Sequence, residues 1–103
     1  MYSQSDINNI IKKFIRLVSE EFPLRYVYLF GSYANGNAGE YSDVDLAIVS
    51  DNFEGSRFFD KKKLIKYILQ TSTDLEIHPF STDDFTEDNP FVKEIIQTGL
   101  KII

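Results

Sequence analysis

Cysteine is absent from the 103-residue chain, and histidine occurs once, at His78. Without thiols the chain can form no disulfide, no thiolate zinc site and no thiol nucleophile. A single histidine also leaves no room for a histidine-rich metal centre. Disulfide-stapled folds and cysteine- or histidine-based metal chemistry are therefore excluded.

Basic residues and long apolar runs are also scarce. Eleven Lys and Arg face 16 Asp and Glu, which gives a net charge of −5. A field of that sign repels a phosphate backbone, so we expect no direct nucleic-acid binding. No segment reaches the length of a membrane span, and the polar residues 1–9 do not resemble a signal peptide. We expect no membrane association and a cytoplasmic location.

The composition is otherwise that of a globular protein. Hydrophobic residues make up 43% of the chain, aromatic residues 15% and charged residues 26%. This content can build a core, and the length suffices for one compact domain but not for two. We therefore expect residues 1–103 to form a single domain.

Helices and strands alternate along the chain. Helical apolar spacing predicts long helices over 5–21 and 57–70 and a short one over 32–35. A fourth helix is expected to begin at Asn89-Pro90 and to end at Gly99. In the helix over 57–70, the inward side chains are expected to be Phe58, Leu64, Ile65 and Ile68. Strands are expected over 24–30, 42–49, 74–80 and 100–103. The pattern predicts an α/β (α+β) domain in which helices pack on one side of a small mixed β-sheet.

Asp43 and Asp45 stand two residues apart on a predicted strand. Side chains at i and i+2 project from one face, roughly 7 Å apart at the backbone. Like charges this close are costly without a counter-ion, and Mg²⁺ prefers oxygen ligands. Taken alone, such a pair is commonly a solvated strand face. Aspartate is a poor strand former, however, so two of them in an apolar strand indicate a functional site.

Two further elements can serve the same chemistry. Gly31-Ser32 directly follows an apolar strand, where glycine lets a backbone approach a phosphate and serine can donate its hydroxyl. Glu76 lies on the third strand, with Asp74 and His78 on the same face. A carboxylate there can complete a metal site or act as a general base. The plain alternatives are an ordinary turn and a polar strand face.

Together these residues spell Gly-Ser, ten intervening residues and Asp-Val-Asp, with a third acid on a later strand. The segment GSYANGNAGEYSDVDLAIV resembles the nucleotidyltransferase domains of the DNA polymerase beta superfamily. In its small size the chain resembles the minimal nucleotidyltransferase (MNT) group, which includes antitoxins of HEPN/MNT toxin–antitoxin pairs. The resemblance covers nearly the whole chain and implies a polymerase beta-like nucleotidyltransferase fold.

The resemblance also implies roles for individual residues. Gly31 and Ser32 would hold the β- and γ-phosphates of a nucleoside triphosphate. Asp43 and Asp45, with Glu76 as the third acid, would be the catalytic residues and bind two Mg²⁺ ions. Asp74 competes with Glu76 for the third position.

The expected reaction moves AMP from ATP onto a hydroxyl of a partner protein, with a tyrosine of a HEPN-type toxin as the acceptor. The alternative is a non-catalytic antitoxin or nucleotide-binding module that neutralises a HEPN RNase toxin by complex formation.

A basic and aromatic segment near the second long helix has two interpretations. Lys61, Lys62, Lys63 and Lys66 form either a solvated helix face or a docking site for an acidic partner. The aromatic residues Phe53, Phe58 and Phe59, where exposed, could form a partner patch. The start of an amphipathic helix explains them equally well.

Overall fold

The computed structural model describes residues 2–39 and 42–103. Its four strands form one sheet in the order β3-β2-β1-β4. The elements along the chain are α1 (Gln4–Ser19), β1 (Tyr26–Phe30), α2 (Ser32–Asn35), β2 (Val44–Ser50), α3 (Arg57–Thr71), β3 (Leu75–Ser81), α4 (Pro90–Thr98) and β4 (Leu100–Lys101). The predicted mixed fold and the order of its elements are confirmed.

The sheet is mixed because its two halves are connected differently. β1 pairs antiparallel with both β2 and β4, whereas β2 pairs parallel with β3. A parallel pair needs a crossover connection, and α3 provides it. β3 therefore forms one edge of the sheet, next to the helix that precedes it.

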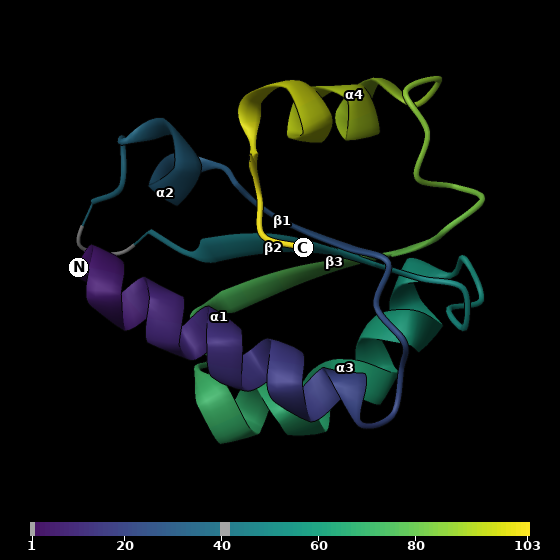
Figure 1. Ribbon diagram of the computed structural model, residues 1–103, viewed down its shortest axis with the longest axis horizontal. Coiled ribbons are helices and arrows are strands. Elements are labelled where there is room, and N and C mark those ends of the chain that lie inside the picture. The colour runs from purple at the N-terminus through teal and green to yellow at the C-terminus, as the bar shows by residue number, and fades with distance from the viewer. Residues whose placement is uncertain (1, 40–41) are drawn as a thin grey trace.

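Helices lie on both faces of the sheet, not on one side as the sequence analysis places them. α1 and α3 cover one face, and α4 lies across the other (Figure 1). Val92 and Ile95 of α4 pack with Ala47 and Val49 of β2. Because both alternating sets of β2 side chains are apolar beyond Asp45, this strand is buried on both faces and needs a cover on each.

The two long helices enclose the larger core. Its members come from α1, α3 and the alternate strand positions, and include Ile7, Phe14, Leu46, Leu64 and Ile77. Side-chain caps fix two helix starts: Ser3 accepts from the Asp6 amide at 3.0 Å, and Asn89 accepts from the Phe91 amide at 2.9 Å. Across the described residues, no helix combines the length and apolar character needed to cross a bilayer.

The orientation of α3 differs from the prediction. Phe58 and Ile65, expected inward, are 71% and 46% exposed, while Phe53, grouped with the candidate exposed aromatics, is buried. Asp60 is fully buried instead, and its carboxylate accepts the backbone amides of Glu54 and Gly55 at 2.9 and 3.0 Å. These two hydrogen bonds compensate the cost of burying the charge and set which face of α3 meets the core.

Candidate functional site

The parallel register brings Asp45 of β2 directly opposite Glu76 of β3. Strand side chains alternate, so both project from the face that carries α4. Asp43 is exposed and immediately precedes β2. The structure therefore brings together the second and third predicted acids of the motif, Asp45 and Glu76, on this face. Within residues 2–39 and 42–103, however, no group of three or more His, Asp or Glu is arranged to hold a metal ion.

Asp45 sits in a partly buried position. Burial raises the pKa of its carboxyl above the ordinary value; the charges of Asp43 and Glu76 act in the same direction, and a contact with His78 opposes them. The ionised form of Asp45 is thus destabilised by its surroundings. A divalent cation would relieve both the burial and the repulsion, and oxygen donors suit Mg²⁺. The environment of Asp45 accordingly fits a metal site.

The turn after β1 lies directly against Asp45. Gly31 has φ +75°, a backbone conformation that side chains disfavour. A Cβ built at Gly31 would overlap Asp45 Oδ2 and lie 3.2 Å from its Cγ. Glycine is thus required here both by conformation and by space. Ser32 follows this glycine directly as the first residue of α2.

Glu76 is held by cations from α3. Lys61 Nζ lies 2.9 Å from Glu76 Oε1, and Arg57 Nη2 lies 3.6 Å from the same oxygen. The hydrogen bond from Lys61 is the largest influence that lowers the pKa of Glu76. Glu76 is therefore kept ionised, and binding a metal through Oε1 requires an exchange with Lys61.

Asp74, the competing third acid, lies outside β3. Its backbone carbonyl accepts from the Val44 amide at 2.9 Å, and its carboxylate accepts from the Tyr2 hydroxyl. Asp74 therefore ties the N-terminal segment to the start of β2. Of the two candidates for the third acid, Glu76 is the one that pairs directly with Asp45 in the sheet.

His78, which lies on the same strand face as Glu76, is the nearest described neighbour of Asp45 on β3 that makes a side-chain contact with it. Its Nε2 lies 3.3 Å from Asp45 Oδ1, and its ring meets those of Phe30 and Phe91 edge-on at centroid distances of 4.9 and 5.8 Å. Burial lowers the pKa of His78 despite the nearby carboxylate. The signal in the sequence was its i+2 position after Glu76 on the same strand face.

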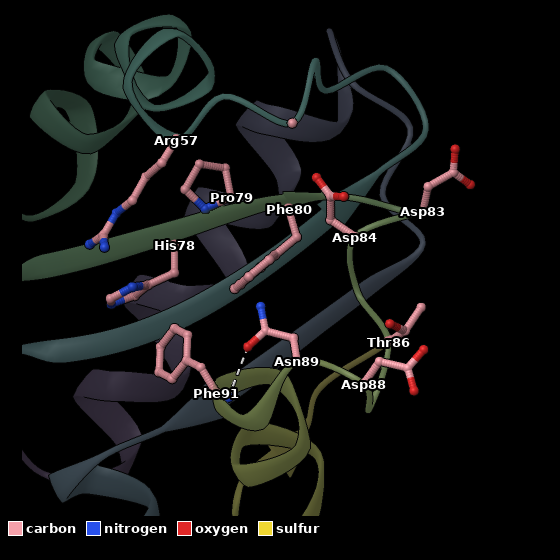
Figure 2. A pocket seen from close by; sticks show the side chains of 11 residues that line it. Arg57, His78, Pro79, Phe80, Asp83, Asp84, Thr86, Asp88, Asn89 and Phe91 are labelled. Carbon is pink, nitrogen blue, oxygen red and sulfur yellow. Dashed lines mark hydrogen bonds between the residues drawn. The ribbon is translucent and has the colours of Figure 1, made fainter.

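A cleft of about 530 Å³ opens beside His78. In Figure 2, His78 lies between Arg57 and Phe91 on one side of the cleft, and Asp84 projects on the other side. Nδ1 of His78 is buried and has no hydrogen-bond partner among the residues that the structure describes. His78 therefore links the cleft, which it lines together with Phe80 and Phe91, to Asp45.

Comparisons with known proteins give the family. The sequence model of the nucleotidyltransferase domain family matches residues 11–102 of the chain. Two Methanocaldococcus jannaschii proteins, "Putative protein adenylyltransferase MJ1379" and "Putative protein adenylyltransferase MJ0126", are 29% and 31% identical over 100 residues, with 97% of each chain covered.

Solved structures share the fold. A crystal structure of a toxin–antitoxin with AMP-PNP superposes with a TM-score of 0.63 and 22% identity, covering 92% of this chain and 71% of that one. The crystal structure of "a putative nucleotidyltransferase from Sulfolobus solfataricus" superposes with a TM-score of 0.61 and 20% identity, covering 97% of this chain and 87% of that one. The glycine–serine turn against Asp45, the fold and the match over 11–102 agree with the resemblance found in the sequence: the chain belongs to the nucleotidyltransferase domain family.

Proposed function

We propose that this chain is a single-domain, Mg²⁺-dependent protein adenylyltransferase that acts in the cytoplasm as an antitoxin. It moves AMP from ATP onto a hydroxyl of a partner, a tyrosine of a HEPN-type toxin. The observation that carries the proposal is the pairing of Asp45 with Glu76 across β2 and β3, with Gly31 packed on Asp45. Two observations support a toxin protein as the acceptor: the relatives are named as protein adenylyltransferases, and a structural neighbour is a toxin–antitoxin complex.

Each residue has a proposed task. The backbone of Gly31 and the hydroxyl of Ser32 bind the triphosphate tail, and Asp43, Asp45 and Glu76 hold two Mg²⁺ ions. When bound, such ions neutralise phosphate charge and make the acceptor hydroxyl more acidic. Nucleotidyl transfer then forms a bond from the acceptor oxygen to the α-phosphorus, breaks the bond to the β-phosphate, and releases pyrophosphate. A carboxylate of this group takes the hydroxyl proton.

The test is incubation of the chain with ATP, Mg²⁺ and a HEPN-type toxin protein, followed by intact-mass measurement. We expect the partner to gain one AMP unit. Asp43→Asn combined with Asp45→Asn should abolish that gain, because both metal ligands are lost. Asp51→Asn, which removes an exposed carboxylate bound to Arg25, is the control and should retain it. No gain with folded chain and folded partner would overturn the proposal.

A second candidate is neutralisation by complex formation alone. The ion pair between Lys61 and Glu76 favours it, because it leaves the third acid occupied. Under this alternative, cells that express the toxin would be protected equally by the wild type and by the Asp43→Asn/Asp45→Asn variant. Loss of protection with the double variant would favour catalysis.

A further inference from the structure

The outward face of α3 is unusually apolar. Among the exposed large hydrophobic residues, four belong to this one helix: Phe58, Phe59, Ile65 and Leu69. Phe58 and Leu69 are 71% and 69% exposed. Single exposed apolar residues are ordinary, but a contiguous group of them marks an interaction surface.

The spacing of these residues indicates what kind of surface they form. Positions 58, 62, 65 and 69 advance by four, three and four residues, which places them in one stripe of the helix. The buried residues of α3, Asp60, Leu64 and Ile68, lie on the other side. We call this stripe, Phe58, Lys62, Ile65 and Leu69, the α3 seam. A four-three alternation is the spacing at which a second helix packs.

The positive charge around the α3 seam limits the kind of partner that can bind there. Lys61 and Lys66 flank the seam and Lys62 lies within it; five of the eleven basic residues of the chain are on α3. Lys62 makes no ion pair with any residue that the structure describes. A second copy of α3 would bring lysine against lysine, which is unfavourable. An amphipathic helix with acidic flanks complements the seam in both shape and charge.

The seam is continuous with the candidate active site. An apolar groove of about 640 Å³ lies along it, lined by Arg57, Phe58, Lys61, Lys62 and Ile65. Arg57 also lines the cleft beside His78, and Lys61 donates to Glu76. A helix seated in the groove would therefore lie next to the acidic pair, where an acceptor hydroxyl is needed.

We propose that the α3 seam docks an amphipathic, acid-flanked helix of the acceptor protein. The inference rests on the proposed function for the identity of the partner, but binding to the seam needs neither nucleotide nor metal. Phe58 and Leu69 anchor the partner helix. Lys62 selects its charge, because among the described residues it has no ion-pair partner, whereas Lys61 and Lys66 already pair with Glu76 and Glu21. The docked helix presents its hydroxyl toward Glu76.

The first experiment uses stapled helical peptides as probes, with fluorescence anisotropy as the readout. One peptide carries leucines at four-three spacing flanked by glutamates, and its control carries lysines in place of the glutamates. We expect the acidic peptide to bind at least ~10-fold more tightly, since each tenfold corresponds to about 1.4 kcal/mol. Lys61→Glu combined with Lys62→Glu should reverse the preference. Equal binding of both peptides, or of a single-stranded oligonucleotide to the same lysines, would overturn the proposal.

Variants of the seam provide the second arm. Phe58→Ser combined with Leu69→Ser should weaken the acidic peptide ~10-fold or more, because exposed anchors carry most of the binding energy. Leu100→Ser combined with Ile103→Ser, at 49% and 44% exposed positions outside α3, is the matched control and should bind as the wild type does. Circular dichroism checks that all three double variants fold. Unchanged binding by the Phe58/Leu69 variant contradicts the seam.

The two proposals fail separately. The Asp43→Asn/Asp45→Asn variant should bind the acidic peptide normally. If the wild type binds this peptide but does not adenylate the partner, the proposed function is wrong and the proposed docking surface stands. If the partner is adenylated, the Phe58/Leu69 variant should raise the KM for the partner ~10-fold with little change in kcat. If the Phe58/Leu69 variant adenylates the partner with an unchanged KM, the proposed docking surface is wrong and the proposed function stands.

Discussion

His78 Nε2 faces Asp45 Oδ1 at 3.3 Å across two neighbouring parallel strands. The imidazole is also enclosed by the rings of Phe30 and Phe91, which restrict its rotation. A side chain that is fixed on one side and bonded to a carboxylate on the other orients that carboxylate. This pairing gives His78 a positioning role toward the proposed metal ligand.

Replacing His78 should therefore weaken cation binding without unfolding the chain. Loss of a residue that supports a metal ligand typically costs 10–100-fold in metal affinity or activity. We expect His78→Leu to weaken Mn²⁺ binding by about that factor and His78→Gln, which keeps a donor, to lose less. Titration of Mn²⁺ by electron paramagnetic resonance measures both. Identical affinities for His78→Leu and the wild type would contradict the positioning role.

Gly31→Ala should damage both stability and the site. Gly31 combines φ +75° with ψ −151°, a region essentially restricted to glycine, so we expect about 2–3 kcal/mol of destabilisation. The new Cβ would also displace Asp45, so binding of Mn²⁺ and ATP should fall. Gly36→Ala is the control: its φ is +76°, but nothing lies within 4 Å of a Cβ there. It should cost about 1 kcal/mol and leave binding unchanged.

Urea unfolding and ATP binding, measured on both glycine variants, separate backbone conformation from contact. Equal losses of ATP binding in the two variants would show that the approach to Asp45 is irrelevant.

Lys61→Met should raise the pKa of Glu76. The lysine is the main cause of the present lowering, and without it the carboxyl returns toward its ordinary value. The stability that ionised Glu76 contributes above that value should shrink accordingly. Because Oε1 no longer has a competing cation, we also expect Mn²⁺ to bind more tightly. Carboxyl ¹³C titration by NMR reports the pKa directly.

Lys62→Met is the matched control for Lys61, since its side chain lies one position along the helix and does not contact Glu76. It should leave both the Glu76 titration and Mn²⁺ affinity unchanged. A Glu76 pKa that stays low in Lys61→Met would show that Lys61 is not its cause.

Asp51 should make the protein sensitive to acid. Hydrogen bonds from Arg25 and Thr82 lower the pKa of Asp51. A carboxyl with a lowered folded pKa contributes stability above its unfolded value of about 3.9, and loses it as pH falls through the folded value. Asp51→Asn should therefore flatten the loss of stability between about pH 5 and pH 3. Thermal unfolding across that range measures it, and parallel curves for variant and wild type would refute the expectation.

The sequence predicted the elements well and their packing less completely. Local signals such as Asn89-Pro90 and Gly31 mark where elements begin and end, and the structure follows them. The family was readable because Gly31-Ser32 and Asp43-Val44-Asp45 are close in sequence. Their roles, and that of Glu76, stay predictions that the experiments above test.

The features that the sequence did not predict depend on contacts between residues far apart in the chain. The facing of Asp45 and Glu76 depends on a parallel register that no local pattern specifies. The rotation of α3 depends on a buried aspartate, Asp60, which looks like a solvent residue in the sequence. Lys61 looked like part of a solvated face, yet it is the main partner of Glu76.

The parallel pairing of β2 with β3 also predicts the order in which the site assembles during folding. The antiparallel β1–β2 pair joins segments near in sequence, and its closure already brings Gly31 to Asp45. Glu76 arrives only when the crossover through α3 is complete, and such long-range closure is slow. We therefore expect a folding chain to bring Gly31 to Asp45 before Glu76 joins them, so the proposed phosphate-binding turn would form before the proposed site is complete.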